Sequence, residues 1–132
     1  MFKQQTPSMD AWMQEAKKDK KAAACGMFLC HNGVVRETPK AEVREHKKGL
    51  KPVTGLLFDY DAEKTKKAVE ETKKMPGIHH VRVWLNQGKL TVGDDIMLVL
   101  IGGDIRPNVI AALETLVGNL KNNCVTEKEL YD

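Results

Sequence analysis

Aromatic residues are scarce in this 132-residue sequence, where Phe, Trp and Tyr together make up 5%. A strong excess of one charge is also lacking, because 21 basic residues face 18 acidic ones and the two signs are interspersed. Nucleic-acid-binding domains usually carry a basic stripe or a recognisable module, often with aromatic stacking residues. The composition therefore predicts no nucleic-acid partner, and it leaves room only for a local basic pocket that binds a small anion.

The sequence also lacks paired cysteines and long apolar runs. Cys25, Cys30 and Cys124 form an odd set without metal-type spacing, which predicts reduced thiols in an intracellular setting. No apolar run approaches the roughly 20 residues needed to span a bilayer, and residues 1–13 contain no secretory-signal pattern. We therefore predict a cytoplasmic protein without membrane association.

Histidines are few and badly spaced for a metal site. His79 and His80 are adjacent, so on a strand they would point to opposite faces, and no cluster of Cys or carboxylate residues joins them. His31 and His46 are isolated, which is typical of polar surface residues. We predict no metal and no bound cofactor.

The segment pattern predicts one α+β domain over residues 1–132. A chain of this length fits a single hydrophobic core. Residues 1–23 are expected to form an N-terminal helix and a charged connection, and residues 122–132 a C-terminal tail. Helical periodicity marks residues 62–75 and 106–121, and strand-like patterns mark residues 24–35, 53–60, 81–85, 90–92 and 95–101. This order predicts a mainly antiparallel sheet with helices packed on one face.

Two segments in the first half of the chain carry special signals. The pair Asn32-Gly33 is a strong turn signal inside a strand-like run, so this run could close a hairpin. Residues 37–51 are charged throughout, contain Pro39 and Gly49, and lack apolar periodicity. They predict a mobile loop beside Arg36, and long charged loops in small domains are often functional.

The clearest functional pattern lies in the last quarter of the chain. Arg106 opens an apolar-striped helix, Lys121 closes it, and Lys128 follows seven residues later. Cations crowded in one pocket bind anions and lower the pKa of a lysine, so that its amine can exchange a proton near neutral pH. One hypothesis is therefore a shared anion pocket formed by Arg36, Arg106, Lys121 and Lys128. The other is that these cations are solvated and that Lys121 merely complements the helix dipole.

Two further features each have a chemical and a structural interpretation. Gly102-Gly103-Asp104 before a helix is compatible with a phosphate-binding turn, although it lacks both the dinucleotide-binding glycine pattern and the Walker lysine. A tight strand-to-helix turn explains it equally well. Cys124, between two lysines, is compatible with an activated thiol, and also with a small hydrophobic residue at a helix end.

Several segments match the pattern of one known family in order and spacing. Residues 26–36, ending Asn-Gly-Val-Val-Arg, resemble the family's first core strand, and residues 56–60 resemble its next strand. Residues 88–94 are similar to its Gly-x-Leu-x-x-Gly-Asp segment. Lys121 and Lys128 have the spacing of its two catalytic lysines. The chain thus resembles a divergent member of the molybdopterin synthase large, catalytic subunit family.

This resemblance implies sulfur transfer in molybdenum cofactor biosynthesis on a hammerhead-like fold. In that family a small ubiquitin-like subunit inserts its C-terminal Gly-Gly thiocarboxylate into the large subunit. Sulfur then passes to a cyclic pyranopterin phosphate to form a dithiolene. The large subunit is a homodimer within a heterotetramer. By resemblance, Lys121 would be the main catalytic group, Lys128 would assist, and Arg36 and Arg106 would hold phosphate or pterin oxygens.

The sequence departs from the family at three places. Leu85-Asn86 stands where the family has a His-Arg pair, and Ile105 stands where a His precedes its substrate-binding Arg. The family's Pro-x-Trp motif is absent from residues 124–127. These departures motivate a second hypothesis, in which the chain is a non-catalytic dimeric binding or regulatory module of the same fold.

Overall fold

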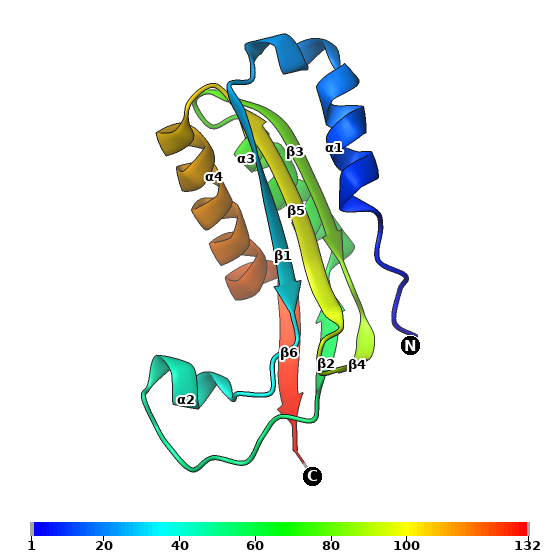
Figure 1. Ribbon diagram of the computed structural model, residues 1–132, viewed down its shortest axis with the longest axis vertical. Helices are drawn as coiled ribbons and strands as arrows, with labels where there is room; N and C mark the ends of the chain where they lie inside the picture. Colours follow the sequence, from blue (N-terminus) through cyan, green and yellow to red (C-terminus); the bar gives the residue numbers. More distant parts are fainter. Residues whose placement is uncertain (1, 132) are drawn as a thin grey trace.

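Two three-stranded antiparallel sheets form the framework of the molecule in the computed structural model, which describes residues 2–131. In spatial order, the first sheet consists of β1 (Met27–Val34), β5 (Asp95–Gly103) and β3 (Ile78–Leu85). The second consists of β4 (Gly88–Thr91), β2 (Gly55–Tyr60) and β6 (Val125–Leu130). Figure 1 shows the second sheet continuing the long axis of the first. The predicted α+β fold with antiparallel strands is confirmed.

Three helices cover the first sheet, one of them on a face of its own. The longer helices are α1 (Met9–Lys18), α3 (Ala62–Lys73) and α4 (Arg106–Asn119). Val99 and Ile101 of β5 pack in the cluster that includes α3 and α4, whereas Leu98 and Leu100 pack against α1. The two clusters lie on opposite faces because successive strand residues alternate. The prediction of helices on one face holds for α3 and α4, whereas the expected N-terminal helix, α1, packs on the opposite face (Figure 1).

Side chains cap the start of two of the longer helices, α1 and α3. Ser8 Oγ accepts a hydrogen bond from the backbone N–H of Ala11 at 3.1 Å, and Asp61 Oδ1 accepts one from Lys64 at 3.0 Å. The other helical segments are short: a 3-10 turn η1 (Lys20–Ala24), a helix α2 (Lys40–Arg44) and a π-helical turn η2 (Leu120–Cys124). The turn η2 directly continues α4 and leads into β6.

The predicted hairpin at Asn32-Gly33 is wrong, because β1 runs straight through this pair. Asn32 lies opposite Leu98 and Gly33 opposite Met97 in the ladder with β5, and the register shifts only after Gly33. The Asn32 amide donates to Asp95 Oδ1 at 3.0 Å. A turn dipeptide therefore remained extended because pairing with the buried strand β5 outweighed the local preference.

Two charged segments also have more structure than the sequence indicated. The segment 37–51, expected to be an irregular loop, contains α2, and the backbone N–H of Val53 donates to Glu37 O at 2.7 Å. The expected tail, residues 122–132, contains β6, which pairs with β2 from Tyr60–Val125 to Gly55–Leu130. Its alternating polar pattern gave little apolar signal, and the strand is recognised only through its partner.

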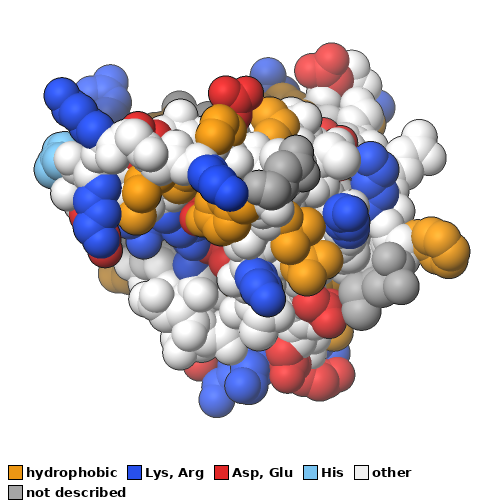
Figure 2. Space-filling model, turned by 90° about the horizontal axis from the view of Figure 1, so that it is seen from below, with side chains coloured by type: hydrophobic (Ala, Val, Ile, Leu, Met, Phe, Trp, Pro, Cys, Tyr) orange, Lys and Arg blue, Asp and Glu red, His pale blue; other side chains and the backbone are white. Residues whose placement is uncertain are grey.

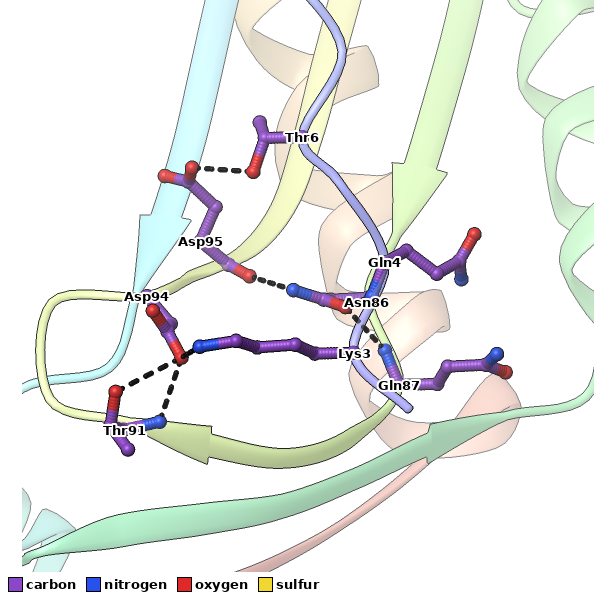
Figure 3. A network of polar contacts seen from close by, with 8 residues as sticks. All are labelled: Lys3, Gln4, Thr6, Asn86, Gln87, Thr91, Asp94 and Asp95. Atoms are coloured by element: carbon purple, nitrogen blue, oxygen red, sulfur yellow. Dashed lines mark hydrogen bonds and ion pairs between the residues drawn. The ribbon is translucent and has the colours of Figure 1, made fainter. Parts of the chain in front are cut away.

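A polar network joins the segment before α1 to the ends of β3 and β5 (Figure 3). Its centre is Asn86, which is buried. Asn86 Oδ1 accepts from the backbone N–H of Gln4 at 2.7 Å and of Gln87 at 2.8 Å. Its Nδ2 donates to Asp95 O at 2.8 Å. Because all these buried polar groups are paired, Asn86 holds the N-terminal segment in place.

Candidate functional site

A charged cavity of about 240 Å³ opens where the two sheets meet near α2. Its apolar wall includes Val35, Val53, Leu56 and Met97. The ionisable side chains that line it come from four separate parts of the chain and are His31, Arg36, Lys40, Lys121, Glu127 and Glu129. Basic and acidic groups are thus brought together over an apolar base, which is an arrangement suited to orienting a small charged ligand.

Each of these side chains is placed by a specific element. His31 is on β1, Arg36 follows the end of β1, and Lys121 lies in the π-helical turn after α4. Glu127 and Glu129 are two residues apart on β6, so their side chains share a face of that strand. The cavity therefore depends on the junction of β1, α4 and β6 rather than on one loop.

Arg36 and Lys121 do share this cavity, as the hypothesis of a shared anion pocket requires for these two residues. Burial at the cavity wall lowers the pKa of the Lys121 ammonium, and the nearby charges of Arg44 and Arg36 lower it further. As a whole residue Lys121 is exposed, so a ligand or partner can reach it. A lysine in this setting loses its proton more readily than an ordinary surface lysine.

Lys40 is a cavity residue that the sequence analysis missed. It is the first residue of α2 and forms an ion pair with Glu127, while its backbone N–H donates to Glu129 Oε2 at 3.1 Å. Burial lowers its pKa first, and the charges of Lys121, Arg44 and Arg36 add to this effect while Glu129 opposes it. The nearest sequence signal was Pro39, the residue that precedes α2.

His31 is the second residue that the sequence analysis did not select. It is half-buried rather than a free surface residue, and burial lowers the pKa of its imidazole before the charge of Lys121 lowers it further. The imidazole is therefore neutral at pH 7, and one of its nitrogens can accept a hydrogen bond in the cavity.

Arg106 and Lys128 do not line this cavity, so within one chain the predicted group of four cations is wrong. Arg106 begins α4, and a 14-residue helix separates it from the end that carries Lys121. At 1.5 Å per residue this separation is about 21 Å. Lys128 lies between Glu127 and Glu129, so strand alternation turns it to the opposite face of β6.

Lys128 instead lines a second hollow, of about 420 Å³, on the outer face of the second sheet. Leu57 is opposite Lys89 on one side and Lys128 on the other in the strand ladders. The two lysines therefore flank one exposed leucine. Sequence spacing alone indicated a position near Lys121, but it did not indicate which face of β6 carries the side chain.

Cys124 and the pair Gly102-Gly103 each have the structural role, and not the chemical one, of the two interpretations that the sequence allowed. Cys124 is buried, and burial followed by the charge of Asp61 raises the pKa of its thiol, which disfavours the thiolate. A Cβ atom on Gly102 would lie 2.6 Å from the Phe28 ring, and one on Gly103 would lie 2.7 Å from Gly77 O. These glycines permit close packing at the strand end.

Two departures from the resembled family lie outside the cavity. Leu85 and Asn86 are buried, and Asn86 uses its side chain to hold the N-terminal segment. Ile105 is exposed before the start of α4. None of these positions supplies a histidine or an arginine to the cavity, whereas His31 does provide an imidazole there.

Residues 2–131 contain neither a candidate metal-binding cluster nor a candidate membrane-spanning helix. In that range no three His, Cys, Asp or Glu side chains are grouped so that they could bind a metal ion. None of the helices in that range has both the length and the apolar character needed to cross a bilayer.

Comparison with known proteins gives a family match and several similar folds. The model of the family described as MoaE protein matches residues 3–123. A comparison with curated protein sequences gives no match. The solved structures described next have sequence identities below 25% and therefore support the fold alone.

Three solved structures illustrate this similarity. Molybdopterin synthase from Staphylococcus aureus aligns with a TM-score of 0.71 and 17% identity, over 96% of this chain and 87% of that one. Molybdopterin cofactor biosynthesis protein E from Burkholderia multivorans aligns with a TM-score of 0.67 and 22% identity, over 97% of this chain and 84% of that one. A chain in a complex of subunits 1 and 2 of molybdopterin-converting factor from Helicobacter pylori aligns with a TM-score of 0.65 and 21% identity, over 93% of this chain and 75% of that one.

Proposed function

The chain belongs to the MoaE family, which places it in molybdenum cofactor biosynthesis as a molybdopterin synthase large subunit, and we propose that sulfur transfer takes place in its charged cavity. The observation that carries this proposal is the convergence of Arg36 and Lys121, 85 positions apart in sequence, on one cavity. Both the sulfur donor, a thiocarboxylate, and the acceptor, a pterin phosphate, are anions. Preorganised cations stabilise such groups strongly where water is partly excluded.

The chemistry assigns separate tasks to the two residues. The thiocarboxylate sulfur adds to a carbonyl-type carbon of the pterin substrate, whose oxygen takes up the C=O electron pair. Water then cleaves the acyl–sulfur bond, so that the donor leaves as a carboxylate, and the oxygen on the substrate carbon leaves as water when the sulfur takes its place. Lys121 in its charged form stabilises the donor anion, and in its amine form it accepts a proton released by the attacking water. Arg36 keeps its charge throughout and holds phosphate or pterin oxygens.

The donor in this proposal is a small ubiquitin-like subunit that ends in Gly-Gly. The Helicobacter pylori structure is a complex of two subunits of molybdopterin-converting factor, and this supports a small partner for the present chain. Two residues without side chains suit entry into a cavity of about 240 Å³. A cytoplasmic location fits the three cysteines, none of which forms a disulfide.

Arg106 has a place in this proposal only if two copies of the chain associate. Within one copy it is at the far end of α4 from Lys121, so it can hold substrate only in the cavity of a partner subunit. A homodimer therefore remains part of the proposal. The non-catalytic alternative is not favoured by the family match, and it predicts binding of the small subunit without product.

Reconstitution with a thiocarboxylated small subunit and the cyclic pterin precursor tests the proposal. Replacing Lys121 with alanine is expected to lower the single-turnover rate of dithiolene formation by about a hundredfold or more, as for loss of an acid–base group. Lys66→Ala, at an exposed position of α3, is the matched control and should retain the full rate. Absence of product from the unaltered chain with a bound small subunit would instead support the non-catalytic module.

A further inference from the structure

The charged cavity contains two lysines, and the second is Lys40 rather than Lys128. Lys40 and Lys121 both line the cavity, and the charge of Lys121 acts directly on Lys40. They come from distant segments, one at the start of α2 and the other after α4. Figure 2, which views the molecule from the lower end in Figure 1, shows basic side chains interspersed with hydrophobic and acidic ones on that end of the molecule.

Strand geometry prevents Lys128 from joining them. Leu57 of β2 lies opposite Lys128, and Phe58 lies opposite Glu127. Phe58 is in the core, whereas Leu57 is exposed on the outer face. Lys128 therefore shares the outer face with Leu57, and moving it to the cavity would require β6 to shift by one residue against β2.

Lys40 is held in place by two carboxylates of the same strand. Its ammonium pairs with Glu127, and its backbone N–H donates to Glu129. Glu129 is fixed in turn, because Tyr131 Oη donates to its Oε1 at 2.9 Å. Two contacts on one strand fix both ends of the Lys40 residue, so its ammonium has a defined position at the cavity wall.

We propose that Lys40 is the second cation of the sulfur-transfer site in this chain, where it holds the incoming anion beside Lys121. The inference rests on the proposed function for the identity of that anion. Arg36, Lys40 and Lys121 face two carboxylates, so the cavity keeps a net positive charge while His31 is neutral. Loss of the Lys40 charge would leave the cavity with no net charge and weaken its hold on an anion.

Binding of inorganic pyrophosphate, followed by NMR titration, tests this assignment without any need for turnover. Lys40→Gln is expected to weaken binding about tenfold, as expected for one charge-assisted contact, and Lys40→Arg should restore most of the affinity. Lys48→Ala, in the same charged segment, is the control and should bind as the unaltered chain does. Retention of the affinity by Lys40→Gln would overturn the proposal.

The same variants in the sulfur-transfer assay separate this proposal from the proposed function. Lys40→Gln is expected to slow dithiolene formation at least tenfold, whereas Lys128→Ala should change it less than twofold. A larger loss with Lys128→Ala than with Lys40→Gln would overturn the assignment. If the unaltered chain makes no product but Lys40→Gln still weakens pyrophosphate binding, the sulfur-transfer function fails while Lys40 stands as part of an anion site.

The fold of the Lys40 variant is checked independently. Glu127→Gln keeps the ammonium but removes its ionic partner, and it is expected to bind pyrophosphate at least as well as the unaltered chain because a competing negative charge is lost. If Lys40 acted only by anchoring α2, Glu127→Gln and Lys40→Gln would weaken binding alike. That result would contradict a direct role for the ammonium.

Discussion

The two sheets of this molecule differ in how they are covered, and this difference separates stability from function. The first sheet, β1-β5-β3, lies between α1 on one face and α3 with α4 on the other, so β5 is buried on both sides. The second sheet, β4-β2-β6, buries Leu56, Phe58 and Leu90 on one face only. Its other face carries Leu57, Lys89 and Lys128 in contact with solvent.

The charged cavity lies where these two sheets meet. Its apolar base comes from residues such as Val35 and Met97 of the well-covered part. Its carboxylates come from β6, at the edge of the second sheet. A sheet covered on both faces thus supplies fixed positions, while a sheet covered on one face leaves an edge strand available for polar side chains.

The largest expected effect comes from truncating a side chain that is buried in the first sheet. Leu100, 0% exposed, packs against α1, and Leu100→Ala should lower the free energy of unfolding by about 3 kcal/mol. Leu57 is 43% exposed, and Leu57→Ala should change it by less than about 0.5 kcal/mol. Urea denaturation measures both. Equal losses would show that the second sheet is covered by something other than solvent.

Loss of the Asn86 side chain should have an intermediate effect at the end of the first sheet. Asn86→Ala leaves the backbone N–H groups of Gln4 and Gln87 without their acceptor, and we expect a loss of about 2 kcal/mol in the free energy of unfolding. Hydrogen exchange should also accelerate at the Gln4 amide. Gln14→Ala on exposed α1 is the control, and a similarly small loss for both variants would contradict the role assigned to Asn86.

The smallest expected effect is a pH dependence that originates in half-buried histidines. Burial lowers the pKa of His31 and His80 from 6.5 in the folded state. The unfolded chain therefore binds protons that the folded chain does not, so stability is complete above pH 6.5 and declines as the pH falls through the folded pKa values. Thermal unfolding between pH 8 and pH 5 measures this decline.

Substitution of each histidine tells which of the two is responsible for the decline in stability. His31 lies at the cavity, whereas His80 is on β3 near the Phe28 ring, with its Nε2 buried and without a hydrogen-bond partner among residues 2–131. Each of His31→Gln and His80→Gln should flatten the decline in stability. An unchanged pH profile in both variants would show that other groups cause it.

The sequence predicted those elements whose own residues determine their conformation. The apolar stripe of α4 and the strongly hydrophobic β5 were recognised because burial imposes a pattern on them. The apolar run of residues 96–101 was recognised as a strand, but its burial on both faces, with α1 on the second one, was not predicted. The segment 125–130 has no such pattern, because its conformation is imposed by pairing with β2.

The site was predicted only in part for the same reason. Lys121 and Arg36 were found because each lies at the end of a recognisable helix or strand. Lys40 was missed because nothing in a charged segment indicates which lysine will face the two glutamates of β6. Lys128 was placed wrongly because the face that a strand residue occupies depends on the preceding turn, and the π-helical turn η2 cannot be recognised from residue types.

The turn η2 has a consequence for how this chain tolerates insertions and deletions. Removal of one residue from the turn, such as Asn122, would move β6 by a single step and reverse both of its faces. Lys128 and Leu130 would then replace the two glutamates at the cavity, and its wall would change from acidic to basic without any substitution of a charged residue. The length of five residues, rather than their identity, thus determines the electrical polarity of that wall.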